Sequence, residues 1–379
     1  TVLHVDQTPQ GDRYADEIAA HGPVEGVRYH AVKMPPFARH WVRLHDWGFW
    51  PAYYWGYRLW QKAALREAMT LHRQAKFDLV HHLNMIGFRE PGYLWQLDAP
   101  FVWGPVGGFA DVPVRFLPAF GVTKGVMYGA KALANRIQQR VLLRPRRAGR
   151  RACVLWAIDG AGVKRMAQLW NVSARAMLET GVALTQDSQR RTKRKGALKL
   201  IWSGEHRVAK ALPLLLHALA RVSEESVELT VLGDGPARER WSRLARTLRL
   251  RNVRWMGWVE KRTALEEVSQ ADCLVHTSLK EGTPHVVLEA LGYGVPVVCH
   301  DACGMCEAVT PECGIKIPMV SPKRSVRDFA AAIDKLLGES GLLVRLGDGA
   351  RRRAEAFTWA DKVTRIRSAY DWVLHGDRP

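Results

Sequence analysis

The stretch that decides the fold lies in the second half of the chain. Residues 272–299 read DCLVHTSLKEGTPHVVLEALGYGVPVVC. The apolar run at 272–277 predicts a buried strand, residues 285–293 predict a helix after a Gly-Thr-Pro turn, and residues 295–299 predict the next strand. Strands joined in this way by helices are typical of βαβ units, which build parallel sheets.

The same alternation extends toward the N-terminus. The preceding strands are expected at 198–203, 227–232 and 253–257, with helices at 210–223, 236–249 and 261–270. Five strands joined by four helices predict a doubly wound unit whose ligand binds outside the carboxyl ends of the strands. Elsewhere the sequence predicts strands at 1–6, 26–32, 77–82 and 100–103, helices at 12–21, 58–75 and 125–152, and a helical region at 326–379 interrupted at 357–360.

The length of 379 residues favours two domains. A basic segment, QRRTKRKG at 189–196, directly precedes the strand at 198–203 and marks the boundary between them. We therefore predict an α/β protein with an acceptor-binding Rossmann-like domain at 1–188 and a Rossmann-like domain at 197–355. Residues 356–379 are expected to form a C-terminal helix that packs back on the first domain.

Positive charge is concentrated in the first half of the chain. Residues 1–200 hold 30 Lys and Arg against 14 Asp and Glu, a net charge of +16, whereas residues 201–379 hold 26 and 23, a net charge of +3. Such an excess indicates an anionic partner. The sequence carries no zinc-finger spacing, RNP-like motif or helix-turn-helix pattern, so we expect no nucleic acid as partner.

Aromatic residues gather in the same half. Five of the 15 Trp residues and three Tyr lie close together, namely Trp41, Trp47, Trp50, Trp55, Trp60, Tyr53, Tyr54 and Tyr57. Trp and Tyr favour lipid headgroups, and each Lys or Arg near an anionic membrane gains about 1 kcal/mol. Two interpretations remain open: residues 37–62 and 124–151 face an anionic membrane, or the Trp cluster packs inside its domain while the charges are solvated.

Targeting and cysteine signals are weak. No window reaches the roughly 18 consecutive apolar residues of a spanning helix, and the first residues resemble a strand rather than a signal peptide. We expect a cytoplasmic chain, peripheral on the inner face of the membrane. Six unevenly spaced Cys argue against a disulfide framework, and the pair Cys303 and Cys306 lacks the second ligand pair of a metal site.

Two carboxylates mark the candidate site. Glu281 lies before the helix at 285–293, and Glu289 lies eight positions later, inside it. Backbone N–H groups between them, at the start of the helix, can bind phosphate. The spacing therefore suits a sugar hydroxyl, a pyrophosphate and a ribose in sequence. Glycines after the earlier strands, such as Gly204 and Gly233, allow a ligand to approach the backbone closely.

The run EGTPHVVLEALGYGVPVV at 281–298 resembles the E-x7-E signature of retaining nucleotide-sugar glycosyltransferases of the GT-B fold, in particular glycosyltransferase family 4 (glycosyl transferases group 1). The resemblance covers about residues 200–316, where the GDGP loop at 233–236 and the Cys303-Gly-Met segment follow in the family's order. Over residues 1–190 it rests on strand–helix alternation and a few loops. It implies two Rossmann-like doubly wound domains that face a cleft.

The resemblance implies catalytic roles for three side chains. Glu281 would lie against the transferred sugar and stabilise an oxocarbenium-like transition state. Lys210 would neutralise the leaving diphosphate, and His82, or as second choice His81, would lie near the anomeric carbon. In the family an Arg usually follows the glycine that corresponds to Gly204, and here Glu205 and Arg207 come next.

The resemblance also implies a donor-binding set. Glu289 would bond the ribose hydroxyls, N–H groups of the 283–286 turn would bind phosphate and sugar, and main-chain atoms near Trp258 would hold the base. The implied donor-binding residues are Gly11, Gly204, Gly233, Trp258, Val259, Gly282, Thr283, Pro284, His285, Val286 and Glu289. The implied acceptor-side residues are His81, Gly107 and Gly108.

The function implied is that of a retaining hexosyltransferase. It would move a sugar from a nucleotide diphosphate sugar to a glycan or lipid-linked acceptor, as in polysaccharide biosynthesis. No cofactor and no obligatory metal are expected, and the sequence has no Asp-x-Asp motif. The alternatives are a catalytically inactive nucleotide-sugar-binding relative and a basic nucleic-acid-binding protein.

Overall fold

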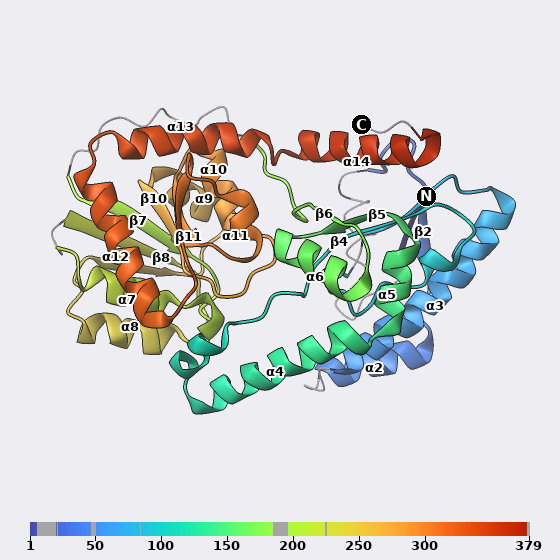
Figure 1. Ribbon diagram of the computed structural model, residues 1–379, viewed down its shortest axis with the longest axis horizontal. Coiled ribbons are helices and arrows are strands. Elements are labelled where there is room, and N and C mark those ends of the chain that lie inside the picture. Colours follow the sequence, from blue (N-terminus) through green and yellow to red (C-terminus); the bar gives the residue numbers. More distant parts are fainter. Residues whose placement is uncertain are drawn as a thin grey trace.

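The computed structural model describes residues 1–5, 20, 22–46, 51–83, 85–184, 196–223 and 226–376. The predicted glycine at position 11 and nearly all of the helix predicted at 12–21 lie outside the described residues, as do Trp47 and Trp50. The architecture consists of two α/β units side by side, and the C-terminal helix returns from the second unit to lie along the first (Figure 1).

The second half forms a six-stranded parallel sheet with the order β12-β11-β10-β7-β8-β9. The strands are β7 (Leu198–Ser203), β8 (Val227–Leu232), β9 (Val253–Gly257), β10 (Cys273–His276), β11 (Val297–His300) and β12 (Gly314–Ile317). The sequence predicted the first five of these strands and missed β12. The strand order reverses between β7 and β10, and ligands of such sheets bind beside the carboxyl ends at this point.

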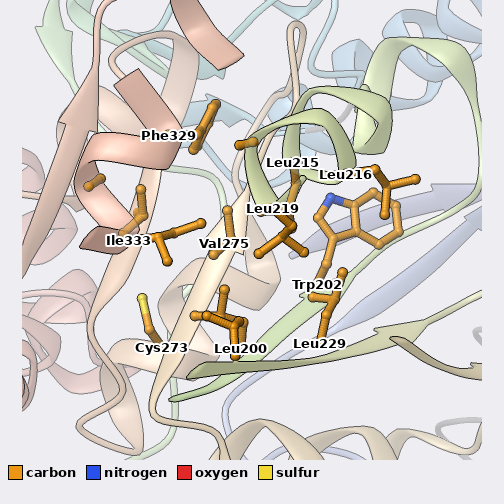
Figure 2. Close-up of a cluster of buried hydrophobic side chains, with 14 of the residues drawn as sticks. Leu200, Trp202, Leu215, Leu216, Leu219, Leu229, Cys273, Val275, Phe329 and Ile333 are labelled. Atoms are coloured by element: carbon orange, nitrogen blue, oxygen red, sulfur yellow. The ribbon is translucent and has the colours of Figure 1, made fainter. Parts of the chain in front are cut away.

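Helices cover both faces of this sheet. They are α7 (Leu212–Leu219), α8 (Arg238–Thr247), α9 (Lys261–Gln270), α10 (His285–Gly292), α11 (Cys303–Ala308), α12 (Pro322–Gly338) and α13 (Leu342–Glu355). On one face Leu200 and Val275 of the sheet pack with Leu215 of α7 and with Phe329 and Ile333 of α12 (Figure 2). This buried layer holds the sheet in place, and the candidate site lies at the carboxyl ends of its strands.

The first half contains a four-stranded parallel sheet, β3-β4-β5-β6, and a separate parallel pair, β1-β2. The strands are β1 (Val2–Val5), β2 (Tyr29–Val32), β3 (Val80–His82), β4 (Phe101–Val106), β5 (Ala152–Ala157) and β6 (Arg175–Ala176). The helices are α2 (Pro36–Asp46), α3 (Pro51–Gln74), α4 (Val122–Val141), α5 (Leu143–Arg151) and α6 (Gly160–Trp170). Neither β5 nor β6 was predicted from the sequence.

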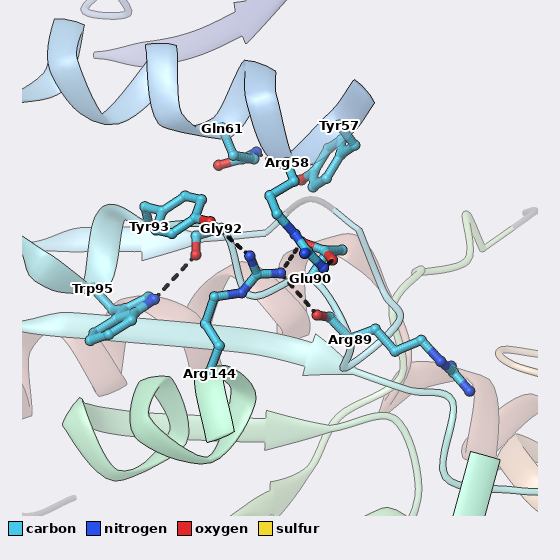
Figure 3. A network of polar contacts seen from close by, with 9 residues as sticks. All are labelled: Tyr57, Arg58, Gln61, Arg89, Glu90, Gly92, Tyr93, Trp95 and Arg144. Atoms are coloured by element: carbon cyan, nitrogen blue, oxygen red, sulfur yellow. Dashed lines mark hydrogen bonds and ion pairs between the residues drawn. The ribbon is translucent and has the colours of Figure 1, made fainter. Parts of the chain in front are cut away.

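Part of the positive charge of this half is neutralised internally. Glu90, whose side chain is 1% exposed, accepts hydrogen bonds from Arg58 of α3 and Arg144 of α5 (Figure 3). Arg144 also donates to the hydroxyl of Tyr93 (2.8 Å) and to the carbonyl of Arg89 (3.2 Å). These arginines join two helices around a buried carboxylate, which balances part of their charge.

Two segments connect the halves besides the linker between β6 and β7. After β4 the chain forms the short helix η2 (Val114–Phe120), whose Phe116 is fully buried against Leu214, Leu279 and Val326 of the second half. Helix α4 then runs back toward the first half (Figure 1). At the C-terminus, α14 (Trp359–His375) packs on β4 and β5 of the first half.

The predicted helical region at 326–379 is divided twice. It was expected to be interrupted at 357–360, which is where α13 ends and α14 begins. A further break separates α12 from α13 at Gly341, which has a φ of +80° and precedes the first residue of α13. Across the described ranges, from residue 1 to residue 376 with their gaps, no helix is both long enough and apolar enough to cross a bilayer.

Candidate functional site

Glycines draw three strand ends together at the carboxyl edge of the six-stranded sheet. The Gly204 N–H donates to the carbonyl of Leu232 (3.2 Å), and the Gly233 N–H donates to the carbonyl of Gly257 (2.7 Å). Gly233 has a φ of +104°, and a Cβ there would lie 2.1 Å from the Gly204 oxygen. Glycine is therefore needed at position 233 for the close approach of the two loops, whereas a Cβ at Gly204 would meet only ordinary contacts, the nearest at 3.5 Å.

Lys210, Glu281 and His276 meet beside this edge. Lys210 lies in the short helix η3 (Val208–Lys210) after β7, and its Nζ bonds Glu281 Oε2. His276, the last residue of β10, places Nε2 3.5 Å from the same oxygen. The strand order brings β7 and β10 together as neighbours, so residues 71 positions apart in sequence become an ion pair.

These contacts keep Glu281 ionised. Burial by itself would raise the pKa of Glu281, but His276 and Lys210 outweigh burial and lower this pKa to about 2. Burial also lowers the pKa of His276, an effect that Lys210 reinforces and Glu281 opposes. The group therefore presents a carboxylate and an ammonium ion next to a buried imidazole with a lowered pKa.

Contacts to the backbone carbonyl and to the aliphatic side chain of Lys210 hold this lysine in place. Thr277 Oγ1 donates to the carbonyl of Lys210 (2.7 Å) and accepts from Trp202 Nε1 (2.9 Å). A Cβ at Gly204 would lie 3.7 Å from Lys210 Cδ, so the aliphatic part of the lysine passes over that glycine. His276 and Thr277 were not predicted as site residues, because in sequence they belong to an apolar strand and its end.

Glu205, the departure from the family pattern, has its own partner. Its carboxylate pairs with the guanidinium of Arg207, two residues later, and both side chains are largely exposed. The neighbouring cation thus compensates the charge that stands where the family usually has Arg. Lys210 pairs with Glu281 rather than with Glu205, and the pair lies at the carboxyl edge of the sheet.

In the turn between Glu281 and α10, two of the backbone N–H groups predicted to bind the ligand donate hydrogen bonds within the protein. The Thr283 N–H donates to Glu179 Oε1 (3.4 Å), and the His285 N–H donates to the Thr283 carbonyl (3.0 Å). Glu179, which comes from the segment after β6, was not predicted. Its approach depends on how the two halves pack, and the sequence carries no signal for this contact.

Glu289 and Trp258 lie on either side of the start of α9. Glu289 on α10 places Oε1 3.8 Å from Nζ of Lys261, the first residue of α9. Trp258 follows β9, and 76% of it is exposed, whereas Val259 is partly buried. The ribose contact of Glu289 and the base contacts near Trp258 and Val259 stay predictions.

The first half covers the Glu281 turn from the opposite side. A Cβ at Gly107 would lie 2.6 Å from Ile158 Cδ1, and one at Gly282 would lie 3.9 Å from the same atom. The predicted acceptor-side loop and the predicted donor turn therefore lie on two sides of one isoleucine. Gly108, the next residue of that loop, accepts a hydrogen bond from Asn135 Nδ2 at its carbonyl (3.0 Å).

Polar contacts also cross between the halves here. Lys280 Nζ lies 3.9 Å from Asp111 Oδ1, and the Gly160 N–H at the start of α6 donates to Glu307 Oε1 (2.7 Å). Pro284 lies against α11, since a Cβ at Gly304 would be 2.7 Å from its Cδ. The site is thus enclosed by loops from both halves of the chain.

His82 and His81 are held inside the first half. His82 is buried, and burial lowers its pKa to about 4. Its Nε2 has no hydrogen-bond partner among the described residues, and its ring lies beside Gly92. His81 contacts the Gly104 carbonyl (3.0 Å) and the Tyr370 hydroxyl of α14 (2.6 Å). No contact found in the described residues joins either ring to Glu281, so their predicted contacts to the donor sugar and acceptor stay predictions.

The cysteine pair is not arranged as a metal centre. Burial raises the pKa of Cys303 to about 11 and that of Cys306 to about 12, so both are protonated thiols at neutral pH. Within the part of the chain that the structure describes, no three His, Cys, Asp or Glu side chains form a potential metal site.

The second half of the chain matches a known family of proteins. Residues 185–353 match the model of the family described as Glycosyl transferases group 1. The second half of the chain is therefore similar to group 1 glycosyltransferases. The matched region contains Lys210, Glu281 and Glu289, the residues that the E-x7-E resemblance had singled out.

Curated proteins similar to the second half are found in several bacteria. Over 195 residues it is 30% identical to the D-inositol 3-phosphate glycosyltransferase of Streptomyces bingchenggensis, a match covering 48% of this chain and 42% of the relative. The chain thus spans less than half the length of the curated relatives it matches.

Solved structures extend the likeness to the whole chain. A lipopolysaccharide outer core galactosyltransferase in its apo form matches with a TM-score of 0.60 and 16% identity, over 91% of this chain and 84% of that one. A glycosyltransferase from Rickettsia africae matches with a TM-score of 0.61 and 11% identity, over 97% and 89%. At these identities the likeness establishes the fold. The predicted GT-B fold is confirmed.

Proposed function

We propose that this chain is a retaining, metal-independent glycosyltransferase that uses a nucleotide diphosphate sugar as donor. The observation that carries the proposal is the meeting of Lys210 and Glu281 at the point where the strand order of the six-stranded sheet reverses. Ligands of doubly wound sheets bind at this point. An anion-binding ammonium ion beside an ionised carboxylate suits a diphosphate joined to a sugar that develops positive charge.

Each charge would have its own part of the donor. Lys210 would bind the leaving diphosphate, and the N-terminus of α10 would add backbone N–H groups. Glu281 would stabilise the positive charge that develops on the sugar ring as its bond to the diphosphate breaks. Since Lys210 and Glu281 bond each other, the diphosphate would compete with the carboxylate for the lysine.

Retention of configuration would follow from attack on the face that the diphosphate leaves. The departing diphosphate would take the acceptor proton, so a separate base from the protein would not be needed. The acceptor would be a glycan or a lipid-linked sugar that enters from the first half, past Gly107 and Gly108. Enclosure by loops from both halves would exclude water and thereby limit hydrolysis of the donor.

The test is transfer and hydrolysis with a panel of UDP-, GDP- and ADP-linked sugars in the presence of EDTA. We expect turnover of at least one donor, and loss of this turnover in Glu281→Gln. Glu239→Gln is a matched control, because Glu239 is exposed on α8 and only pairs with Arg243. Binding of a donor without turnover would instead identify an inactive nucleotide-sugar-binding relative, and dependence on added metal would contradict the metal-independent reaction.

We further propose that helix α4 attaches the protein to an anionic membrane surface. Its exposed apolar side chains recur at helical spacing and share one face, namely Val122, Val126, Leu133, Ile137 and Val141. Exposed Lys124, Arg140 and Arg147 lie on α4 and α5, and residues 122–151 contain no acidic residue. An apolar face with basic neighbours is typical of helices that lie in the membrane interface.

Vesicle flotation tests this attachment. We expect binding to vesicles that contain phosphatidylglycerol, weak binding to pure phosphatidylcholine, and loss of binding in Leu133→Asp/Ile137→Asp. Val320→Asp is the control, since Val320 is exposed in the second half, after β12. Preferential retention on DNA or RNA at physiological salt would favour nucleic acid as the anionic partner and contradict the membrane proposal.

A further inference from the structure

Glu179 connects the first half of the chain to the Glu281 turn. It lies three residues after the end of β6, and its N–H donates to Thr283 Oγ1 (2.9 Å). In return the Thr283 N–H donates to Glu179 Oε1 (3.4 Å). Two reciprocal hydrogen bonds thus fix a carboxylate from the first half against the residue that lies two positions after Glu281.

The carboxylate faces the interior of the site. A Cβ at Gly282 would lie 3.5 Å from Glu179 Oε1, an ordinary van der Waals distance, so Gly282 lies directly beside this carboxylate. The charged groups that act on Glu179 are Glu281, His285 and Lys362 of α14, whose Nζ donates to the carbonyl of Leu178. Glu179 therefore forms a second carboxylate beside the turn that is expected to bind the donor sugar.

The second carboxylate oxygen of Glu179 is the atom that points to a ligand. Oε2 is buried and has no hydrogen-bond partner among the described residues. A buried carboxylate oxygen without a donor is costly, and it is satisfied by a ligand that brings a hydroxyl group. The hydroxyls of a sugar bound against Glu281 and Gly282 would supply that donor.

We propose that Glu179 binds a hydroxyl of the donor sugar and selects neutral sugars over uronic acids. This inference rests on the function proposed above. A hydroxyl donates a charge-assisted hydrogen bond to the carboxylate, whereas the carboxylate of a uronic acid brings another negative charge close to Glu179 and Glu281. Repulsion between like charges in a partly buried site excludes such a ligand and so gives specificity.

The test compares donors that share a nucleotide and differ only at C6: UDP-glucose with UDP-glucuronate, and GDP-mannose with GDP-mannuronate. The readouts are kcat/KM for transfer and Kd from calorimetry. In Glu179→Gln we expect kcat/KM for the neutral donor to fall at least about tenfold, as for loss of a hydrogen bond to a charged group. The Kd for the uronate donor would stay unchanged or decrease. The preference for the neutral sugar would therefore fall at least about tenfold.

Two variants separate selection from a structural role. A glutamine at 179 can still accept from the Thr283 N–H, whereas Thr283→Val removes only the hydroxyl that accepts from Glu179. We expect Thr283→Val to keep the neutral-to-uronate preference, even where it lowers kcat for both donors. Equal loss of preference in Thr283→Val and Glu179→Gln would assign Glu179 to positioning of the turn and overturn the proposal.

The outcome for Glu179 is distinguishable from that for the proposed function. If the wild-type protein transfers sugar and Glu281→Gln does not, an unchanged preference in Glu179→Gln overturns the role of Glu179 alone. If no donor is turned over, the transferase function fails, and the calorimetric preference still decides whether Glu179 selects neutral sugars. Absence of donor binding in the wild-type protein overturns both proposals.

Discussion

Lys210 and Glu281 are bonded to each other across the gap between two strand ends, one after β7 and one after β10. Their side chains are 24% and 18% exposed, so the pair is screened from water but open to a ligand. His276 lies under the same carboxylate. In this arrangement an anionic ligand competes with Glu281 for the lysine, and the predictions for the site follow from that competition.

Removal of the ammonium group is expected to impair catalysis more than folding. Lys210→Ala should lower kcat/KM by about 100- to 1000-fold, as is usual when a group that stabilises transition-state charge is lost. Steady-state kinetics and the unfolding midpoint check this together. Lys335→Ala is the control, because Lys335 is exposed on α12 and lies outside the site. A loss below about fivefold would show that diphosphate binding does not depend on Lys210.

The pH dependence follows from the lowered pKa of Glu281. A carboxylate with a pKa of about 2 in the folded state stays ionised until the pH falls close to that value. Its ion pair therefore contributes above the unfolded-state pKa of about 4.3 and is lost only as the pH drops through about 2. We expect kcat/KM to show no acidic limb near pH 4 to 5 due to Glu281. A donor Kd from calorimetry that changes between pH 4 and 5 in the wild type but not in Glu281→Gln would contradict this assignment.

The close approach of the strand ends predicts a cost at Gly233. Gly233→Ala should destabilise the protein by more than about 3 kcal/mol, since a Cβ would overlap the Gly204 oxygen and the φ is positive. Gly121→Ala is the matched control: its φ is also positive, at +81°, but a Cβ there meets nothing within 4 Å. The control should cost only about 1 kcal/mol. Urea denaturation of both variants measures the difference.

The second half of the fold was predictable because its elements are separated by strong local signals. The runs that form β7 to β11 are apolar and end in glycine or polar turns, so periodicity and turn residues agree. β6 has only two residues, and β12, which is as long as β10 and β11, has a lysine between its two isoleucines (Gly-Ile-Lys-Ile) and so lacks the continuous apolar run of those strands. Their pairing is decided by neighbouring strands rather than by their own sequence.

The candidate site was predictable where it depends on one segment and not where it depends on packing. Glu281 and Glu289 stand out by their spacing along one turn and helix. His276 looks like an ordinary strand residue, and Glu179 reaches Thr283 only because the halves meet at that place. The total charge of the first half was informative, but it did not reveal that Arg58 and Arg144 neutralise Glu90 inside the fold.

The buried carboxylate of the first half is expected to matter for stability. Glu90→Gln should lower the free energy of unfolding by about 3 kcal/mol, because it leaves Arg144 largely buried without a charged partner. Glu339→Gln is the matched control, since Glu339 also pairs with an arginine, Arg345, but both are exposed. Its cost should be under about 1 kcal/mol. Equal effects in the two variants, measured by chemical denaturation, would show that the buried pairs add nothing specific.

Histidine burial in β3 predicts a loss of stability with falling pH, in a higher pH range than that of the Glu281 ion pair. The pKa of His82 is lowered to about 4 by burial, against about 6.5 in the unfolded chain. Between these values the unfolded state binds more protons, so the free energy of unfolding falls as the pH falls. From pH 7 to pH 5 this single residue should cost about 2 kcal/mol of stability.

Replacement of the titrating ring isolates that contribution. His82→Gln cannot take up a proton, so its unfolding free energy should decrease less between pH 7 and pH 5 than that of the wild type, by about 2 kcal/mol. The variant also loses packing beside Gly92, and this lowers stability equally at both pH values. The change in unfolding free energy with pH therefore separates the effect of protonation from that of packing. Parallel pH profiles for the two proteins would mean that the His82 ring takes up its proton over the same pH range in the folded and the unfolded state, and this would contradict the lowered pKa.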